Sequence, residues 1–563
     1  MRYLLWSVVL ATMLTAVVVI SRPILPVDET RYLSVAWEAH QRGDYLVSHL
    51  NGEPYSHKPP LLFWLINVVW FVTGVDELAG RLVAPASGLM CLVLTFLMTR
   101  RLWPQNLQVI QLAPVVHVSL MLWIVFCPLT MFDTLLTCCS LCSLLGLLYA
   151  SEGKTYRGWL MAGCGMGLGI LTKGPVVLVH VLPAALMAPW WSSTVRSRIP
   201  RWYAGLLVVT LLVAAIGLAW ALPSAAAGGA KYSNELLFGQ TAGRMVNSFA
   251  HRQPFWWYLP WLPLCLMPWI SFGAVWRGIR LTAFDSGMRF LVCCAGGSLL
   301  ILTLVSGKQI YYLLPMFPPC AIILARIMTS VDNVGRRDLA FIAPGTIGMA
   351  LLPTVFNSIP ELTKARLTGV LDNSYAIPLG LCGALLLVPA WKKVSSMVLA
   401  VATSSVVFIS IVVWGISGSL WDGFNLKPIA HFTAGCSRPV AWLGDYHGQL
   451  NFIGEIPSID ETFNTEALEH WLEKNPEGAV IVRLSEANPA WQNLKEPLDA
   501  VDRTEPSGEQ KQLISDLLSS HPEFPLARLK PEILFAQKIR RGLTFDLTVI
   551  VSYRDATSLP QQN

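Results

Sequence analysis

The chain has 563 residues, of which 54% are hydrophobic and only 13% are charged. Soluble globular proteins carry about 25% charged residues, so this composition excludes a soluble enzyme and indicates an integral membrane protein. Residues 1–420 hold 28 Lys and Arg against 15 Asp and Glu, whereas residues 421–563 hold 13 against 20. The bases lie beside apolar stretches and not in one patch, which suits anionic membrane lipids and argues against a nucleic acid partner.

Thirteen apolar stretches are close to the roughly 20 residues that span a bilayer. The first could be a signal peptide, but it lacks a clear cleavage site, and we interpret it as an uncleaved span. Lys and Arg follow alternate spans, so the positive-inside rule places the chain's C-terminal end outside the cytoplasm. The expected spans are 3–20, 79–99, 107–127, 134–150, 158–172, 175–191, 203–222, 257–276, 289–305, 310–327, 339–355, 375–391 and 395–417.

A further apolar run, 61–75, would reverse this alternation if it crossed the membrane. Pro59 and Pro60 precede it, and proline suits the first turn of a helix. We therefore expect a short helix in the outer interface. The outer segments are then 21–78, 128–133, 173–174, 223–256, 306–309, 356–374 and 418–563.

Two domains are expected: a membrane domain, 1–418, with the first outer loop at 21–78, and a soluble domain, 419–563. The soluble part combines β-rich runs at 479–484 and 543–552 with a helical pattern at 465–474, which predicts a small α/β domain. It shows no nucleophile, phosphate loop or metal-ligand cluster. Eleven of the twelve cysteines lie in apolar runs, and Cys436 is alone in the polar tail, so no disulfide framework or metal-type pair can be identified.

The outer ends of the spans gather many ionisable residues. Charged groups at membrane depth are costly, which makes these residues functional candidates. The first loop supplies Asp28, Glu29, Tyr55, His57 and Lys58, and later segments supply Asp133, Lys173, Arg244, His251, Arg252, Lys308 and Tyr312.

Asp28 precedes a helical pattern, 31–41, that stops at Gly43. It could cap this helix, or it could be a carboxylate that orients or deprotonates an acceptor. Lys58 stands where the short helix begins, where the helix dipole adds to its charge and favours an anion such as phosphate. A lysine that only extends its charge to the interface is the alternative.

Asp133 is a lone carboxylate in a long apolar region, at a predicted outer turn, where helix capping is an equal alternative. Lys173 precedes Gly174 and Pro175, and a plain turn lysine explains it well. Arg244, His251 and Arg252 precede an aromatic cluster that resembles an interfacial belt. Arginines there suit bidentate phosphate binding. Lys308 also lies in a predicted outer segment, 306–309. Together these bases indicate an anionic lipid headgroup as ligand.

In the motifs PVDETRY, YSHKPPLLFWL, LTKGP, HRQPFWWYLP and SGKQIYYLLP, taken together, the chain resembles the transferases that attach 4-amino-4-deoxy-L-arabinose to lipid A. These belong to the GT-C protein O-mannosyltransferase superfamily. The resemblance covers most of the membrane part. It implies a GT-C fold and an undecaprenyl-phosphate-linked sugar donor, with inverting transfer to lipid A at the periplasmic side of the bacterial inner membrane, a reaction tied to polymyxin resistance.

The resemblance also implies roles for single residues. Asp28 and Asp133 match the catalytic aspartates, while Tyr55, Lys58, Arg244, Lys308 and Tyr312 match contacts to the donor phosphate or lipid. No cofactor or metal is implied, and we expect a monomer in contact with membrane lipids. Another sugar, or a protein hydroxyl or surface glycan as acceptor, stays open.

One departure concerns His57, since many of these transferases have glutamate at this position. His57 as a metal ligand is a minor alternative, because no second ligand has helical spacing to it. A lipid flippase or transporter is the competing class, but the charges gather at one membrane face and no internal repeat is visible. A scaffold whose tail binds an envelope partner is a third alternative.

Overall fold

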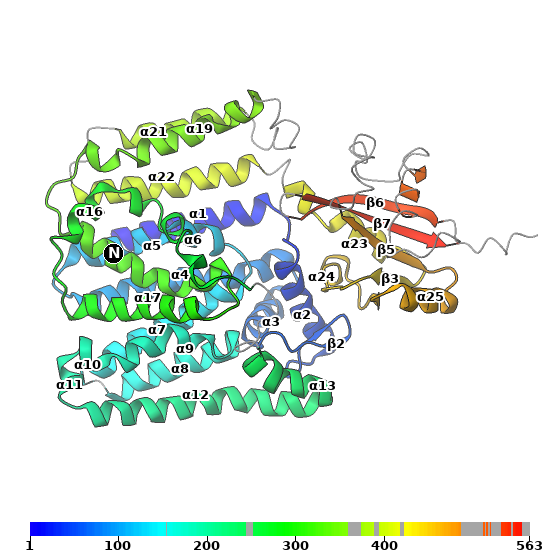
Figure 1. The fold of residues 1–563 in the computed structure, drawn as a ribbon, viewed down its shortest axis with the longest axis horizontal. Coiled ribbons are helices and arrows are strands. Elements are labelled where there is room, and N and C mark those ends of the chain that lie inside the picture. The colour runs from blue at the N-terminus through cyan, green and yellow to red at the C-terminus, as the bar shows by residue number, and fades with distance from the viewer. Residues whose placement is uncertain are drawn as a thin grey trace, which may run out of the picture. The chain divides into compact units, whose positions relative to one another are not determined.

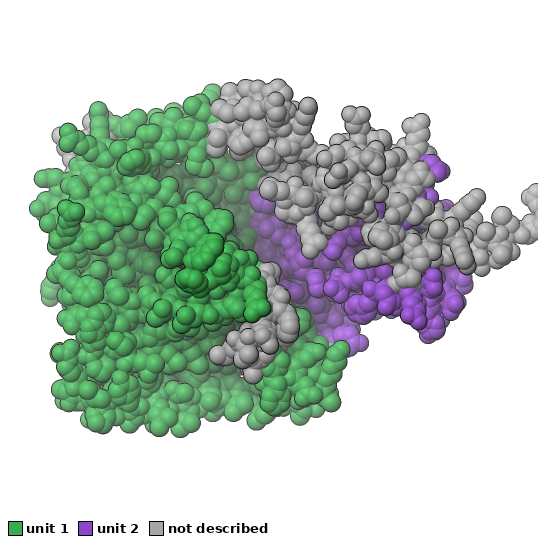
Figure 2. All heavy atoms as spheres, viewed as in Figure 1, with its two compact units in different colours: residues 1–21, 44–48, 54–417 green, residues 22–43, 49–53, 418–563 purple. Residues whose placement is uncertain are grey.

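The computed structural model describes residues 1–153, 155–243, 252–358, 373–387, 393–416, 421–485, 511–512, 514–515, 518, 531–541 and 544–553. The chain divides into two compact units, coloured in Figure 2. Unit 1 comprises residues 1–21, 44–48 and 54–417, and unit 2 comprises residues 22–43, 49–53 and 418–563.

Unit 1 is α-helical, and its long helices run alongside one another (Figure 1). Seven helices in the described part of the chain are long and apolar enough to cross a membrane, as expected for a multi-pass membrane protein. They are α1 (Arg2–Ser21), α4 (Glu77–Leu102), α7 (Phe132–Ser151), α12 (Ile199–Ala227), α17 (Ser286–Leu304), the continuous stretch of η4 (Ile310–Met316) and α18 (Phe317–Met328), and α22 (Val394–Gly415).

Unit 1 contains further helices. They are α3 (Leu61–Thr73), α5 (Leu107–Val118), α6 (Met121–Phe126), α8 (Thr155–Lys173), α9 (Val176–Leu186), α10 (Ala188–Trp191), α11 (Ser193–Arg196), α13 (Gly229–Asn234), the π-helix η1 (Glu235–Gly243), η5 (Arg336–Leu339), α19 (Ile342–Ser358), η6 (Asn373–Tyr375) and α21 (Ala376–Leu386). The short helix predicted after the two prolines is confirmed, because α3 starts directly after Pro60 and ends before Gly74.

The span predicted at 257–276 is wrong, because no continuous helix covers it. This stretch folds into η2 (Phe255–Tyr258), α15 (Leu262–Cys265), η3 (Trp269–Ser271) and α16 (Gly273–Ile279). Pro260, Pro263 and Pro268 each lack the backbone N–H donor that the interior of one continuous helix would need. Residues 257–276 are therefore not one continuous helix, and the number of thirteen spans stays a prediction.

Unit 2 combines α2 (Asp28–Arg42) and β1 (His49–Leu50), which pairs with β2 (Glu53–Pro54), with the C-terminal residues. The C-terminal sheet has the order β4 (Asp460–Thr462), β3 (Val440–Leu443), β5 (Ala479–Ser485), β7 (Thr544–Tyr553) and β6 (Pro531–Arg541). β3 runs parallel to β4 and β5, whereas β7 is antiparallel to β5 and β6. The helical elements beside the sheet are η7 (Trp421–Phe424), α23 (Lys427–Ala434), α24 (Asn451–Gly454) and α25 (Thr465–Lys474).

Strand β5 explains why the sheet is covered on both faces. Successive side chains of a strand point to opposite faces. Val480 and Val482 join one buried cluster, which includes residues of α25, while Ala479 and Ile481 join another, which includes residues of α23. All four side chains are buried, so both faces are packed. The predicted α/β fold of the soluble part is confirmed.

Candidate active site

The hairpin of α7 and α8 brings two predicted site residues together. Its helices pack closely because glycines face the partner helix. A Cβ atom on Gly158 would lie 2.2 Å from the backbone N of Ala150, and one on Gly146 would lie 2.4 Å from the backbone N of Ala162. Small residues at such positions let two helix backbones approach, and any larger side chain would force them apart. The pairing fixes the register in which the start of α7 meets the end of α8.

Asp133 and Lys173 lie at that meeting point. Asp133 is in the first turn of α7, and Lys173 is the last residue of α8. Lys173 Nζ donates a hydrogen bond of 2.6 Å to Asp133 Oδ1, and the side chains are only 9% and 4% exposed. Asp133 does not cap its helix, since the cap residue is Met131, whose side chain makes no cap bond. The capping alternative for Asp133 is therefore wrong, and a buried ion pair takes its place.

Two tyrosines of η4 cover the lysine of this pair. Lys173 Nζ lies 4.5 Å from the ring centroid of Tyr312 and 5.3 Å from that of Tyr311. A cation above an aromatic ring is attracted by the electron-rich face. The predicted donor contact Tyr312 thus lies beside the ion pair, and its neighbour Tyr311 joins it there.

The loop before α3 reaches Phe132, the residue next to Asp133. Lys58 Nζ lies 5.8 Å from the ring centroid of Phe132, the residue before Asp133. Tyr55 is 6% exposed, and its ring centroid lies 5.1 Å from that of His57 and 6.4 Å from that of Phe63. The Phe63 ring in turn packs edge-to-face with that of Phe132, with ring centroids 5.4 Å apart. Aromatic contacts therefore connect the loop that carries Tyr55, His57 and Lys58 to the start of α7.

Glu235 is a residue of this region that sequence reasoning missed. Ser56, between Tyr55 and His57, is 4% exposed, and its hydroxyl donates a hydrogen bond of 2.9 Å to Glu235 Oε2. Glu235 begins the π-helix η1, a rare conformation that is often found at functional sites. No local pattern in the sequence relates residues this far apart, so only the fold reveals the contact.

Lys308 lies in a second part of the region. It is 2% exposed, and its ammonium group donates to the carbonyl of Gln253 at 3.3 Å and to that of Val305. Burial lowers the pKa of Lys308. A lysine has three N–H donors, so these two carbonyls leave one of them without a partner among the described residues. Arg252 is exposed and pairs with Gly307 through an antiparallel backbone bridge.

Tyr258 connects this part to the ion pair. Its hydroxyl donates a hydrogen bond of 3.2 Å to the carbonyl of Gln309, the residue after Lys308. Burial, together with the neighbouring Tyr312 and Asp133, raises the pKa of Tyr258. Arg244 and His251, which were predicted in the same loop, lie outside the described residues.

Unit 2 carries the remaining predicted residues, Asp28 and Glu29. The cap position of α2 is Val27, without a side-chain bond, so the capping alternative for Asp28 is wrong. Instead, Asp28 Oδ1 accepts hydrogen bonds from Arg31 Nη2 and, at 3.1 Å, from the Tyr32 hydroxyl. The Asp28 side chain is 37% exposed, which leaves it accessible to a substrate.

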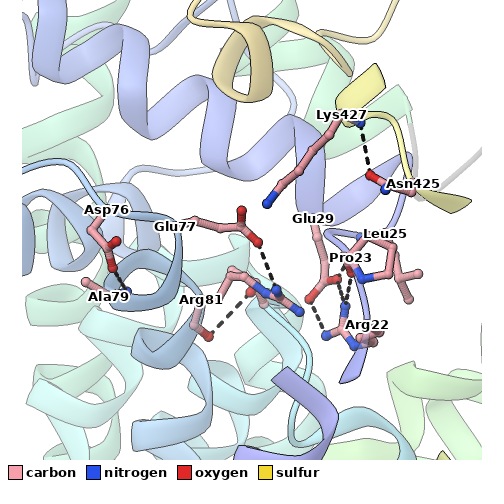
Figure 3. A network of polar contacts seen from close by, with 11 residues as sticks. Arg22, Pro23, Leu25, Glu29, Asp76, Glu77, Ala79, Arg81, Asn425 and Lys427 are labelled. Atoms are coloured by element: carbon pink, nitrogen blue, oxygen red, sulfur yellow. Dashed lines mark hydrogen bonds and ion pairs between the residues drawn. The ribbon is translucent and has the colours of Figure 1, made fainter. Parts of the chain in front are cut away.

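Glu29 has a different environment. It is 2% exposed and receives two hydrogen bonds from Arg22, of which the Nη2–Oε1 bond measures 2.9 Å (Figure 3). The backbone N of Leu25 also donates to it, at 3.1 Å. Glu29 therefore closes the turn that leads into α2.

In unit 1, the buried Arg81, which the sequence did not single out, donates a 2.9 Å hydrogen bond to Glu77, also visible in Figure 3.

Among the described residues, no three His, Cys, Asp or Glu side chains are grouped so that they could hold a metal ion. His57 is exposed and has its ring beside Tyr55. All twelve cysteines are free.

Comparison with known proteins adds to this geometry. Residues 57–220 match the family described as dolichyl-phosphate-mannose-protein mannosyltransferase. The chain is 29% identical over 318 residues to the undecaprenyl phosphate-alpha-4-amino-4-deoxy-L-arabinose arabinosyl transferase of Erwinia tasmaniensis, which covers 55% of this chain and 57% of that protein. Transferase 1 of the same description from Sodalis glossinidius is 29% identical over 310 residues, with 53% and 54% covered. The chain thus spans a little over half the length of the curated relatives it matches.

The crystal structure of ArnT from Cupriavidus metallidurans bound to undecaprenyl phosphate is similar over 99% of both chains, with a TM-score of 0.66 and 17% sequence identity. The chain has the GT-C fold. The apo structure of that protein gives the same TM-score at 18% identity. The predicted resemblance to aminoarabinose transferases is confirmed, as is the prediction of a multi-pass membrane protein.

Proposed function

We propose that the protein is a glycosyltransferase whose donor is a sugar linked to undecaprenyl phosphate. The proposed sugar is 4-amino-4-deoxy-L-arabinose, and the proposed acceptor is a phosphate of lipid A. Transfer would occur with inversion and without a metal ion, on the periplasmic side of the bacterial inner membrane. In this proposal residues 1–418 are the catalytic membrane domain, and residues 419–563 are a periplasmic domain.

The observation that carries the proposal is the arrangement around Asp133 in unit 1. Lys173 binds Asp133 directly, and Lys58 lies over the neighbouring Phe132 ring. Lys173 Nζ also lies over the ring of Tyr312. Cations and phenol rings at the ends of apolar helices suit a ligand with a phosphate headgroup and an apolar tail. The relatives named for undecaprenyl-phosphate-linked aminoarabinose support the same reading.

The chemistry follows from the movement of charge. The bond between the anomeric carbon and the phosphate oxygen breaks, and its electron pair stays on the leaving undecaprenyl phosphate. Positive groups fixed near that oxygen stabilise the developing charge, and they are most effective where water is excluded. Lys58 and the remaining donor of Lys308 are assigned this role, with Arg244 as a third contact. The acceptor oxygen attacks the opposite face of the sugar, which inverts the configuration.

Asp28 is assigned to the acceptor. A lipid A phosphate is already ionised at neutral pH, so it needs orientation and not deprotonation, and Arg31 beside Asp28 supplies a matching positive charge. A hydroxyl acceptor would instead lose its proton to Asp28 as general base. The exposed Asp28 carboxylate is compatible with either acceptor.

Mass spectrometry of lipid A and surface glycans, from cells with and without the protein, tests the proposal. We expect a mass increment of one aminoarabinose on lipid A phosphate only when the protein is present. A different increment would revise the sugar, and an increment on a protein or core glycan would revise the acceptor. Unchanged lipid A and glycans, together with no transfer by the purified protein, would contradict the proposal.

A further inference from the structure

Helix α2, which begins with Asp28, is attached to the C-terminal residues of its own unit. Ser34 lies in the middle of α2 and is 1% exposed. Its hydroxyl donates a 2.7 Å hydrogen bond to the carbonyl of Gly448 and accepts one of 3.1 Å from the backbone N of Phe452. One side chain of the first loop therefore bonds the backbone of the loop before α24, through Gly448, and of the first turn of α24, through Phe452.

Asn51 makes a second attachment. Its amide binds the backbone of Ile459 twice, because Nδ2 donates to the carbonyl and Oδ1 accepts from the N–H, each at 2.8 Å. Oδ1 also accepts from Asn451 Nδ2 at 3.2 Å, and Nδ2 donates to Glu461 Oε1 at 3.2 Å. The Asn51 side chain thus docks onto β4 and the loop before it as a neighbouring strand would.

The turn that contains Asn51 is tied back to the end of α2. The backbone N of Gly52 donates to Glu38 Oε1 at 3.1 Å, and Arg42 Nη2 donates to the carbonyl of Gly52 at 3.2 Å. Arg42 Nε also donates to Glu38 Oε1, at 2.8 Å. Helix α2 is therefore held at its middle through Ser34 and at its end through this turn.

We propose that Ser34 and Asn51 are positioning residues, which hold the helix that carries Asp28 in one orientation against the C-terminal domain. The proposal rests on the function proposed above, in which Asp28 meets the acceptor. It gives the C-terminal domain a task, because its loops would then set where the carboxylate points.

The polar nature of both attachments is the physical reason for this assignment. Apolar contacts are non-directional and tolerate small shifts of a helix. Hydrogen bonds weaken steeply when distance or angle changes, so two of them at different points of α2 fix its rotation and its register. A misplacement of about 1 Å can lower a rate by about 10²-fold, so such attachments bear on catalysis.

Asn51→Gly isolates the side chain, because Asn51 has φ +57°, a backbone conformation that glycine adopts without strain. The matched control is Asn464→Gly in the same unit, which removes one asparagine contact, the 2.8 Å cap of α25. We expect Asn51→Gly to lower kcat by about 10- to 100-fold while KM for the donor stays within a factor of two. The control should retain wild-type kcat.

Hydrogen exchange of the full-length protein gives a readout that does not depend on activity. Backbone amides of α2 should exchange faster in Asn51→Gly than in wild type or in Asn464→Gly. Wild-type kcat in Asn51→Gly would overturn the proposal, whether or not the Tm of the variant is lowered. If the wild type transfers no sugar, the proposed function fails, whereas the exchange data still test the attachment itself.

Ser34→Ala provides a second, independent variant, and Thr433→Val is its control. Thr433 is a buried residue in the same unit whose hydroxyl, within the described part of the chain, bonds to Ile429 of its own helix and to no other residue. We expect Ser34→Ala to reduce kcat in the same direction as Asn51→Gly, with little change for Thr433→Val. If Ser34→Ala and Thr433→Val reduce kcat equally, loss of any buried hydroxyl explains the effect, and the positioning role is overturned.

Discussion

The two predicted catalytic carboxylates each bind a base, but in opposite surroundings. Asp133 binds Lys173, 40 residues away on the next helix, and both side chains are at most 9% exposed. Asp28 binds Arg31, one turn further along its own helix, and its side chain is 37% exposed. One pair depends on the tertiary structure, whereas the other needs only a helix.

This difference indicates different tasks. Opening a buried ion pair leaves an uncompensated charge away from water, which is costly, so the Asp133–Lys173 pair is suited to a fixed element of the site. An exposed pair gains little from its own contact, so a substrate can replace one partner at small cost. In the proposed function, this difference suits Asp28 to meet the acceptor and Asp133 to hold the donor region in shape.

The largest effect is expected for Asp28→Asn. The change keeps the size of the side chain but removes its charge and its ability to take a proton, so stability should change little. With a hydroxyl acceptor, transfer should fall by about 10²–10⁴-fold, and with a phosphate acceptor by less. Transfer rates of the purified variant with native donor and acceptor measure the size of this loss. Asp76→Asn, a change at the exposed cap of α4, should be silent. Wild-type rates in Asp28→Asn would remove the catalytic role.

Lys58→Ala should produce the next largest loss. The variant removes a positive charge near the proposed position of the leaving phosphate, and removal of one such contact typically costs about 10²–10³-fold in rate. Lys58 is partly exposed, so Tm should stay close to the wild-type value. Lys231→Ala, at an exposed lysine of α13, is the control. Full turnover in Lys58→Ala would refute the donor-phosphate assignment.

The buried pair should respond mainly in stability. Lys173→Met leaves the Asp133 charge buried without its partner, and loss of one member of such a pair costs about 3–5 kcal/mol. The double variant Lys173→Met with Asp133→Leu should recover much of that loss, because no charge is left uncompensated. Thermal unfolding in detergent measures both.

Activity of the double variant then separates the two tasks of the pair. If Asp133 and Lys173 only shape the site, the restored double variant should regain transfer. If either touches the substrate, the double variant should be stable and inactive. If the single variant Lys173→Met is as stable as wild type, the buried Asp133–Lys173 pair does not stabilise the fold, and the distinction between the buried and the exposed pair fails.

Local features could be predicted from the sequence because they depend on near neighbours. Gly43 ends α2 in the left-handed conformation, Pro60 precedes α3, and the patterns at 465–474 and 479–484 give α25 and β5. Contacts across the chain could not be predicted in the same way. The Asp133–Lys173 bond depends on glycines that bring two helices together, and the Asn51 contacts depend on a strand some 400 residues later.

The smallest predicted effect concerns the pH dependence of the stability of Asn51→Asp. It tests the polar attachment of α2 in unit 2, which differs from the close packing of glycines between α7 and α8 in unit 1. Burial raises the pKa of Glu461, and the charges of Asp445 and Glu53 add to this, while the hydrogen bond from Asn51 opposes it. The variant replaces that bond with a second carboxylate beside Glu461, so the two should repel when both are ionised. Glu461 should then bind protons more tightly in the folded than in the unfolded state, so unfolding free energy falls as pH rises.

We therefore expect the Tm deficit of Asn51→Asp, relative to wild type, to shrink as pH is lowered through the raised pKa of Glu461. An additional pKa shift of one unit corresponds to about 1.4 kcal/mol, which sets the scale of the effect. Asn51→Gly also loses the hydrogen bond to Glu461, together with every other bond of the Asn51 side chain, but adds no charge, so its deficit should vary less with pH. Tm measured across a pH series for the three proteins distinguishes them. Parallel curves for Asn51→Asp and Asn51→Gly would mean that Glu461 does not face the substituted side chain, and the polar attachment at β4 would then need another explanation.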